Sequence, residues 1–577
     1  MNNEPSFNDR INHLIAAFDS DNYSVDPSTD VSVYKGFIGM RAMHKTAVIG
    51  TTGKKKKAYY IEGEPYTMGY LMGKLAEPEI ERMCTDFNNG IIFDFINWQI
   101  PEEIRDGLGE IIEDIVNSVS VSQGIKQDVP KQFVEELEGM LDGCKEVHHK
   151  THVDHKSLWV LNVGIDVILS HLYTGSKPPE KKYPFELQPY FFKVPIMCNG
   201  FTAKGTDPQT QQPYHFMGRD FMFPTADVYQ DTAAMIIRKP ATGNPTVSVA
   251  APGMIGTITG INSCGVGVGV DILPSANCNP NRAGVNSLLL TRWSIENGKN
   301  CKEAVDVMVN AQRGVSWIYI IADGTTDMAC IVEAGESTGQ LDFLSYADDW
   351  VVETLEKVNP QFKDLLKNPS APVQNGLMVR WNDYTYPPIY QSFNKELIKK
   401  YKKVPFFLPP FFMPPYKYSY NPQDFGGRNY LNKTWKDKNC PGPYYFAPQR
   451  ENVPSVTLVT NHCIIPEMRL CAMKLWTAII ALGNIDDIQW RYDELNNELL
   501  TILEQGYMTY DEAKAAIDYL APYRKFPDYY NKDRKPHDQV QIHGSVSIID
   551  LKQLTIETHY GYFSDEWIKI SMKNYIG

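Results

Sequence analysis

The stretch Cys198-Asn-Gly-Phe-Thr-Ala-Lys-Gly205 marks the point where this 577-residue chain changes character. Directly before it, residues 175–184 read Gly-Ser-Lys-Pro-Pro-Glu-Lys-Lys-Tyr-Pro, a composition typical of irregular structure. We therefore interpret residues 175–197 as an exposed linker. Upstream of it the hydrophobic pattern is mostly helical, and downstream it approaches the period of two that is typical of strands. Cys198 thus separates a mainly helical segment, 1–197, from a strand-rich segment, 198–577.

The apolar residues predict the secondary structure on both sides of this boundary. Upstream, helices are predicted at 102–119, around 133–141 and at 158–172. Downstream, strands are predicted at 215–223, 233–238, 246–250, 256–261, 265–272, 317–322, 328–333, 456–460, 544–549 and 554–560. Helices are predicted at 287–297, at 302–311 and, after a Thr509–Glu512 capping box, through about 520. This order indicates sheets with helices on their outer faces.

Composition narrows the class of protein. The formal charge of -13 argues against a nucleic-acid surface, which needs a basic patch. We interpret the one dense basic run, 54–57, as a solvated turn. No basic start with an apolar core and no apolar run of about 18 residues is present, so we expect a cytoplasmic protein without a transmembrane segment. If a signal has been removed, a lysosomal or secreted protein is expected instead.

Residues 383–450 are dense in Pro, Tyr and Phe, which is too apolar for a disordered linker. We expect an irregular insertion packed on the body, either lining a substrate pocket or serving only as surface packing.

Cys198 is the first candidate for catalysis. An N-terminal cysteine supplies both a thiol nucleophile and an α-amine, of reference pKa about 8, that acts as the base. That amine exists only after the Met197–Cys198 bond is cut. The alternative is a small buried cysteine with no chemical function.

Six segments in a common order carry a family resemblance. They are Ile61-Glu-Gly-Glu-Pro-Tyr66-Thr-Met-Gly69-Tyr-Leu-Met-Gly73, Cys198-Asn-Gly-Phe-Thr-Ala-Lys-Gly205, Phe216-Met-Gly218-Arg219-Asp220-Phe221, Gly253-Met-Ile-Gly-Thr-Ile-Thr-Gly-Ile-Asn262-Ser-Cys-Gly265-Val266, Val270-Asp271-Ile-Leu-Pro274 and Thr460-Asn461-His462. Together they resemble the N-terminal-nucleophile (Ntn) hydrolases of the choloylglycine hydrolase and penicillin acyltransferase (peptidase C45) group, which is related to acid ceramidase. The resemblance spans about residues 60–470.

The resemblance implies an α+β fold, an αββα sandwich with two mainly antiparallel sheets between helical layers. It implies self-cleavage before Cys198, with 1–197 retained as a pro-segment subunit and 198–577 as the catalytic chain. The substrate would be a small-molecule or lipid-like amide, with no cofactor or metal, and a homo-oligomer is compatible.

The resemblance also assigns roles at the site. Cys198 would be the nucleophile, and Arg219 would lower the pKa of its thiol. Asn461 and a backbone N–H at Asp271 would bind the oxyanion. His462 is a further candidate, for which a structural role is favoured.

Three positions depart from the family pattern. Met222 stands where the family has Asp, Asp220 stands where it usually has Asn, and Asp271 stands where the acyltransferase branch often has Asn. Either the strand register differs from that of the family, or Asp220 or a later carboxylate such as Asp227 or Asp231 holds the α-amine.

Two other classes stay open. One is a hydrolase built on Cys463 and His462, on Cys264, or on a zinc site of His148, His152 and His155, which would share one face if that segment were helical. A polar helix face is the favoured interpretation of the three histidines. The other class is a binding or scaffold protein that kept the fold, which Met222 supports.

Overall fold

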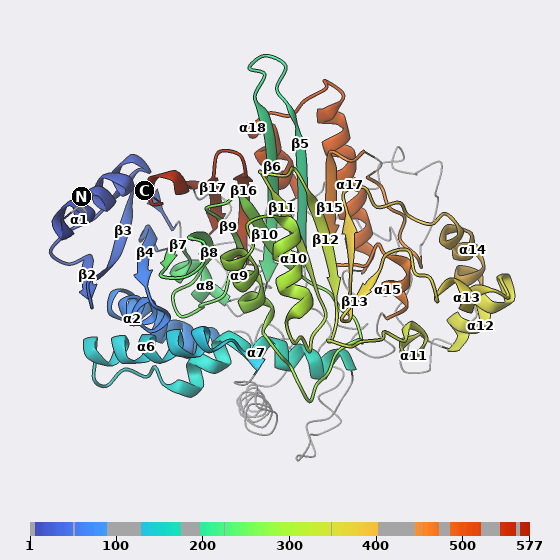
Figure 1. The fold of residues 1–577 in the computed structure, drawn as a ribbon, viewed down its shortest axis with the longest axis horizontal. Helices are drawn as coiled ribbons and strands as arrows, with labels where there is room; N and C mark the ends of the chain where they lie inside the picture. Colours follow the sequence, from blue (N-terminus) through green and yellow to red (C-terminus); the bar gives the residue numbers. More distant parts are fainter. Residues whose placement is uncertain are drawn as a thin grey trace.

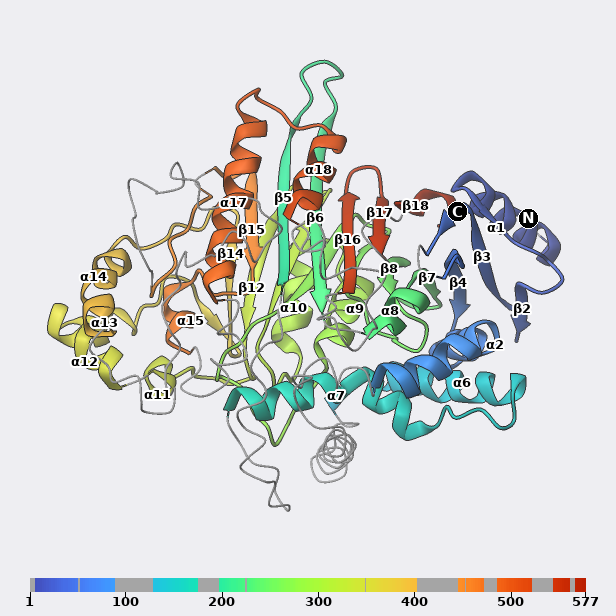
Figure 2. The ribbon, with the colours of Figure 1, turned by 180° about the vertical axis from the view of Figure 1, so that it is seen from behind.

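The computed structural model describes residues 6–49, 52–88, 128–174, 197–223, 226–347, 349–401, 445–451, 453–471, 485–520, 543–560 and 566–576 (Figures 1 and 2). The helix predicted at 102–119, the linker up to 196 and most of the 383–450 insertion lie outside these residues.

The larger of two sheets, sheet A, holds twelve of the described strands. They are β1 (Tyr23–Ser24), β2 (Val31–Tyr34), β3 (Phe37–Val48), β4 (Lys55–Gly63), β7 (Ala234–Pro240), β8 (Thr246–Ala250), β9 (Thr259–Asn262), β10 (Val266–Ile272), β11 (Trp317–Asp323), β12 (Ala329–Ala334), β13 (Val373–Gln374) and β14 (Leu377–Trp381). Neighbours pair antiparallel except β4 and β7, which pair parallel. Sheet A therefore joins strands from both sides of Cys198.

The smaller sheet, sheet B, contains Cys198. Its order is β15 (Val456–Thr460), β5 (Met197–Thr206), β6 (Pro213–Phe223), β16 (His543–Asp550), β17 (Thr555–Tyr560) and β18 (Ile568–Ser571), and all pairs are antiparallel. The β5–β6 hairpin projects beyond the body beside α17 (Ile485–Leu503) and α18 (Tyr510–Leu520), as Figures 1 and 2 show.

The two sheets face each other between helical layers. Helices α9 (Ser287–Asn297) and α10 (Cys301–Asn310) contact sheet A, and α17 and α18 contact sheet B. Gly269 of β10 permits the close approach of the sheets, because a Cβ there would lie 2.7 Å from Cδ of Arg219 in β6. Helices combined with mainly antiparallel sheets make an α+β protein, as the sequence predicted.

Helices α1 (Phe7–Ser20), α2 (Pro65–Arg82), α6 (Lys131–Val147) and α7 (His155–Thr174), with the π-helical turn η1 (Met83–Phe87), precede Cys198. Helices α2 and α6 lie backbone to backbone. A Cβ on Gly69 would overlap the carbonyl of Glu136, and one on Gly139 would overlap that of Tyr66. The sequence signal is Gly-x-x-x-Gly in both helices, at 69–73 and 139–143.

The first segment differs from the expectation in one respect, because β1 to β4 are strands within a region expected to be mainly helical. The solvated turn predicted at 54–57 is wrong. Lys56 is buried, and its Nζ donates to the carbonyl of Glu566 at 2.6 Å. Burial lowers the pKa of Lys57 to about 8, and Glu79 pairs with its ammonium group. These partners are distant in sequence, so composition alone could not reveal them.

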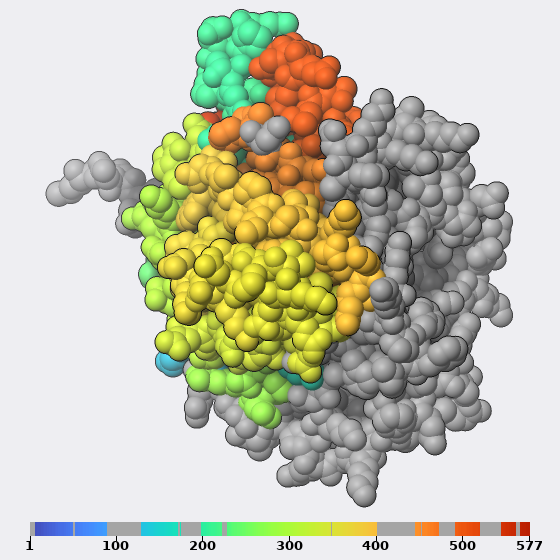
Figure 3. Space-filling view, turned by 90° about the vertical axis from the view of Figure 1, so that its right-hand side faces the viewer, coloured from blue at the N-terminus to red at the C-terminus, as the bar shows by residue number. Residues whose placement is uncertain are grey.

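The remaining described helices are α8 (Ala226–Thr232), α11 (Phe343–Tyr346), α12 (Asp349–Val358), α13 (Phe362–Leu365), α14 (Ile389–Tyr401) and α15 (Pro466–Leu470), with the 3-10 turn η7 (Met572–Asn574). Helices α12 to α14 form the yellow and gold surface in Figure 3. Helix α14 corrects the expectation of irregular structure at the start of the 383–450 insertion. Oδ1 of Asn394 in α14 accepts from the backbone nitrogens of Tyr445 and Phe446, which fixes the described end of the insertion on the body.

None of the helices in the described ranges is long and apolar enough to cross a membrane.

Candidate active site

Cys198 is the second residue of β5, still joined to Met197 by the peptide bond. It is buried, and its backbone nitrogen donates to Oδ1 of Asn461 at 2.9 Å. In the β5–β6 register Cys198 lies opposite Phe221, so both side chains occupy the same face of sheet B. The candidate nucleophile therefore lies on β5, between β15 and β6, and polar candidate site residues lie on both sides of it.

Arg219 also lies on that face, because it pairs with Gly200, two residues from Cys198. Its guanidinium is buried, forms an ion pair with Asp271 of β10 and donates to the carbonyl of Asn199 at 3.2 Å. Burial raises the pKa of Asp271 to about 6, and the charges of Arg219 and Arg491 oppose that rise. Arg219 thus links β5, which carries Cys198, to sheet A and places a positive charge between the sheets.

Asn461, directly after β15, contacts both halves of the site. Its Oδ1 accepts from the Cys198 nitrogen, and its Nδ2 donates to the carbonyl of Ile272 at 2.9 Å. Asn461 is the residue that the resemblance implies as an oxyanion donor. In the structure it also contacts the nitrogen that would become the α-amine.

Arg491 of α17 is a site residue that the sequence analysis missed. Its Nη1 donates to the carbonyl of Cys198 at 2.7 Å and to Oδ1 of Asn199 at 2.6 Å, and its Nη2 donates to Oδ1 of Asn461 at 3.2 Å. The residue is buried under the helical layer of sheet B. No local motif surrounds Arg491, and its partners are about 30 to 293 residues away in the chain, so no signal in the sequence marked it.

Asp220 faces away from the Cys198 side chain, because neighbouring residues of a strand alternate between faces and Arg219 occupies the inner one. Its Oδ2 accepts from Nδ2 of Asn199 at 2.9 Å. Asp231 lies with Arg82, at 3.2 Å, and the Asp227 side chain lies outside the described residues. The structure therefore brings Asp220 to the side chain of Asn199, on the face of β5 opposite the Cys198 thiol.

The other candidate catalytic residues, His462, Cys463 and Cys264, each have different neighbours from those of Cys198. Nδ1 of His462 lies 2.9 Å from Oγ1 of Thr460, and its ring packs edge-on against Tyr492. Burial raises the pKa of the Cys463 thiol well above its usual range, and the nearby Glu333 carboxylate adds to the rise. A protonated thiol is a poor nucleophile. Cys264 lies in the β9–β10 turn, with Sγ 3.5 Å from Oδ1 of Asn244.

A single helix through His148, His152 and His155, which a shared zinc site would have required, is not formed. His148 follows the last turn of α6, and His155 begins α7. The intervening turn separates the three imidazoles, so they do not share one helix face. His148 lies instead with Glu77 and Glu81 of α2.

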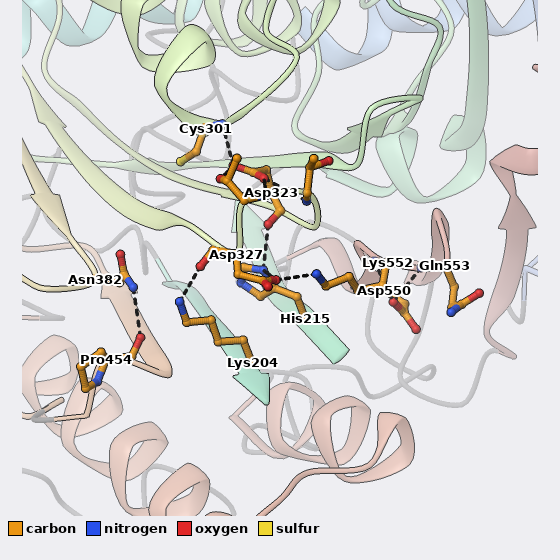
Figure 4. Close-up of polar contacts among 12 residues, drawn as sticks. Lys204, His215, Cys301, Asp323, Asp327, Asn382, Pro454, Asp550, Lys552 and Gln553 are labelled. Carbon is orange, nitrogen blue, oxygen red and sulfur yellow. Dashed lines mark hydrogen bonds and ion pairs between the residues drawn. The ribbon is translucent and has the colours of Figure 1, made fainter. Parts of the chain in front are cut away.

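A second buried histidine lies outside the Cys198 site. Nδ1 of His215 is 2.9 Å from the carbonyl of Asp323, and Asp327 joins Lys204 and Lys552 in the same network (Figure 4). Burial lowers the pKa of His215 to about 4. In β5 and β6, His215 pairs with Lys204, six residues from Cys198 and therefore about 20 Å along the strand. His215 is thus too far away to act as a base for Cys198.

An apolar pocket adjoins the same face of sheet B. Its lining residues are Phe87, Val160, Leu161, Ile165, Phe221, Tyr229, Met254, Ile258, Asn286, Leu288 and Trp317. Phe221, the register partner of Cys198, connects the pocket to the candidate nucleophile. Helix α7 and η1 form one wall, and the other is formed by residues of β6, α8, the loop between β8 and β9, the start of α9, and β11, so both segments of the chain are needed to build it.

Polar contacts hold α7 against the other wall. Asn162 donates to the carbonyl of Gly253 and accepts from the nitrogen of Ile255, each at 2.9 Å. Asp166 accepts from the backbone nitrogen of Ser287, at the start of α9, at 2.8 Å and from its hydroxyl at 3.1 Å. Burial raises the pKa of Asp166 to about 7, although the Ser287 hydrogen bonds oppose the rise.

This raised pKa predicts greater stability in mild acid. The folded protein holds a proton on Asp166 between its unfolded pKa of 3.8 and about 7, so stability falls as pH rises through that window. We expect the unfolding free energy of the parent to fall between pH 5 and pH 8 by about 1–2 kcal/mol more than that of Asp166→Asn. Urea unfolding of both proteins at pH 5 and pH 8 measures this difference. The same change in unfolding free energy for parent and variant would contradict the prediction.

Comparisons with known proteins add a distant context. No protein-family profile matches the chain. An uncharacterized protein of Archaeoglobus fulgidus is 26% identical over 521 residues, which cover 90% of this chain and 66% of the relative. This chain thus spans just under two thirds of the length of that relative.

Two solved structures of conjugated bile acid hydrolase variants from Clostridium perfringens were also matched. The first aligns with a TM-score of 0.31 and 8% identity, covering 65% of this chain and 92% of that structure. The second aligns with a TM-score of 0.26 and 10% identity, covering 68% and 86%.

Proposed function

We propose that this chain is a self-processing cysteine hydrolase or acyltransferase with an Ntn-type αββα sandwich, acting on an amide bond through Cys198. The observation that carries the proposal is the contact between Oδ1 of Asn461 and the Cys198 backbone nitrogen, with Arg219 and Arg491 on the two sides of the same strand. Cleavage before Cys198 would turn this nitrogen into an amine already held by an acceptor.

Self-cleavage is the first proposed step. The Cys198 thiol attacks the carbonyl carbon of Met197, the acyl group moves from nitrogen to sulfur, and water hydrolyses the resulting thioester. The products are a carboxylate at Met197 and a free α-amine at Cys198. Asn461 would then hold that amine through Oδ1, and Arg491 would fix both Asn461 and the Cys198 carbonyl.

The same thiol then serves the external reaction. The α-amine takes the thiol proton, the sulfur attacks the substrate carbonyl, and the amine returns the proton to the leaving nitrogen. We propose that the second N–H of Asn461 and a backbone N–H near Asp271 bind the oxyanion. Water, or an acceptor amine, takes the acyl group and releases the enzyme.

The pocket supports an apolar acyl group as the substrate class. Its walls are almost entirely aliphatic and aromatic, and apolar surface favours apolar ligands. Phe221 carries this surface to the position of Cys198. We therefore propose linear amides with an apolar acyl chain or ring as substrates.

The test is the intact mass, under denaturing conditions, of wild type and Cys198→Ala. We expect wild type to separate into fragments 1–197 and 198–577, allowing for trimming in the linker, and Cys198→Ala to remain whole. Cys264→Ala is the matched control, because Cys264 is the more accessible thiol and should leave cleavage unchanged. A wild type that stays one chain under acid and under reducing conditions would overturn the proposal.

A binding or scaffold protein with this fold is the second candidate. Met222, opposite Met197 in β6, stands where the resembled family carries Asp, and this observation favours it. An intact wild type whose Cys198 thiol does not react with iodoacetamide would support it.

A further inference from the structure

Glu77 and Glu81 lie one turn apart on α2, and His148 follows the end of α6. One donor atom from each side chain can be chosen so that all three lie within 4.8 Å of one another. The glycine contacts between α2 and α6 fix this proximity, because the two backbones touch at Gly73 and Gly143 just before the cluster.

Glu77 is the unusual member of the cluster. It is 5% exposed, and its Oε1 has no hydrogen-bond partner in the described part of the chain. Nδ1 of His148 lies 3.6 Å from this oxygen, and the His148 side chain is 54% exposed. A buried carboxylate without hydrogen bonds is costly unless a cation compensates it. Its free oxygen is directed at the other two side chains.

Glu81 is already oriented toward the same point. Its Oε1 accepts from the backbone nitrogen of His152 at 2.8 Å, which leaves Oε2 available as a ligand. Two thiols nearby, Cys84 and Cys144, are unsuited, because burial raises the pKa of Cys84 to about 12 and that of Cys144 further. The ligand set is therefore two carboxylates and one imidazole.

We propose that Glu77, Glu81 and His148 bind a divalent transition-metal ion of the Zn²⁺ or Mn²⁺ class. One imidazole with two carboxylates suits these ions better than Ca²⁺ or Mg²⁺, which prefer oxygen ligands alone. Ligands of a tetrahedral zinc ion lie about 3.4 Å apart, close to the 3.6 Å between Glu77 and His148. Rotation of the exposed His148 and half-buried Glu81 side chains brings the third ligand in.

The ion would act as a structural clamp. It would join the kinked part of α2 to the end of α6, and through the Glu81–His152 contact to the turn before α7. Helix α7 supplies Val160, Leu161 and Ile165 to the pocket. The clamp therefore fixes one wall of the pocket without touching Cys198.

The test uses full-length protein carrying Cys198→Ala, so that it does not depend on cleavage or activity. After EDTA treatment and desalting, ZnCl₂ and MnCl₂ are titrated by calorimetry and by thermal unfolding. We expect one equivalent to bind and to raise Tm. Glu77→Gln and His148→Ala should each weaken binding by about tenfold or more and abolish the Tm shift, whereas His149→Ala, the neighbouring exposed imidazole, should change neither.

Two outcomes would overturn the site. One is equal binding by His148→Ala and its parent, which would place the ion elsewhere. The other is a parent that binds neither metal while His148→Ala lowers Tm in EDTA, which would show that Glu77 and His148 form only an ion pair. Binding of CaCl₂ in preference to both transition metals would overturn the assigned class.

Discussion

Arg219→Met is expected to slow cleavage before Cys198 by on the order of 100-fold and to destabilise the protein by about 3–5 kcal/mol. The Arg219 guanidinium lies between the sheets, paired with Asp271 and bound to strand carbonyls on both sides. Methionine fills much of the space but leaves Asp271 as an uncompensated buried carboxylate. Intact mass over time measures cleavage, and urea unfolding in a Cys198→Ala background measures stability.

A second substitution separates the two effects. Asp271→Asn removes the carboxylate, so the double variant Arg219→Met/Asp271→Asn should regain part of the stability lost in Arg219→Met. It should not regain cleavage, because the positive charge beside the nucleophile strand is still missing. Recovery of cleavage together with stability would show that Arg219 is only a packing residue and would remove it from the proposed mechanism.

The sequence predicted those elements whose signal is local. Strand β15 and helix α9 have the predicted bounds, and the Thr509–Glu512 capping box forms with hydrogen bonds in both directions. Strand alternation and capping depend on residues within one segment, which is why they can be read from the chain.

The parts that were missed depend on contacts between distant segments. Lys56 looked like part of a solvated turn, because its partner at Glu566 is 510 residues away. Arg491 lay in no motif, yet it binds the carbonyl of Cys198. For Asp220 the limit is different. The motif gave its position, but its orientation follows from the register of β6, which places Arg219 toward Asp271 and Asp220 toward Asn199.

In the proposed cleaved form, a buried charge cluster would help the β4–β7 pairing of sheet A to hold the pro-segment on 198–577. Glu136 of α6 forms an ion pair with Arg292 of α9 at 2.6 Å and lies 3.9 Å from Nε of Arg238 in β7. Arg292 also pairs with Glu296 at 2.6 Å, so two arginines face two glutamates, all nearly inaccessible to solvent. Burial, followed by the repulsion of Arg292, lowers the pKa of Arg238 to about 9. Glu136 is the only one of the four that precedes Cys198 in the chain.

Glu136→Ala should therefore cost about 3–5 kcal/mol and release the pro-segment from cleaved protein. The variant leaves an excess positive charge buried between Arg238 and Arg292, and the pro-segment loses the ion pair that links it to 198–577. Urea unfolding of the uncleaved Cys198→Ala form measures the cost, and gel filtration of the cleaved form measures the release. Glu296→Ala is the matched control, because it removes a carboxylate from the same Arg292 within one segment. It should destabilise the protein while the two fragments still elute together. Release by both variants alike would mean that general loss of stability, rather than the Glu136 contact across the cleavage boundary, decides whether the fragments stay together.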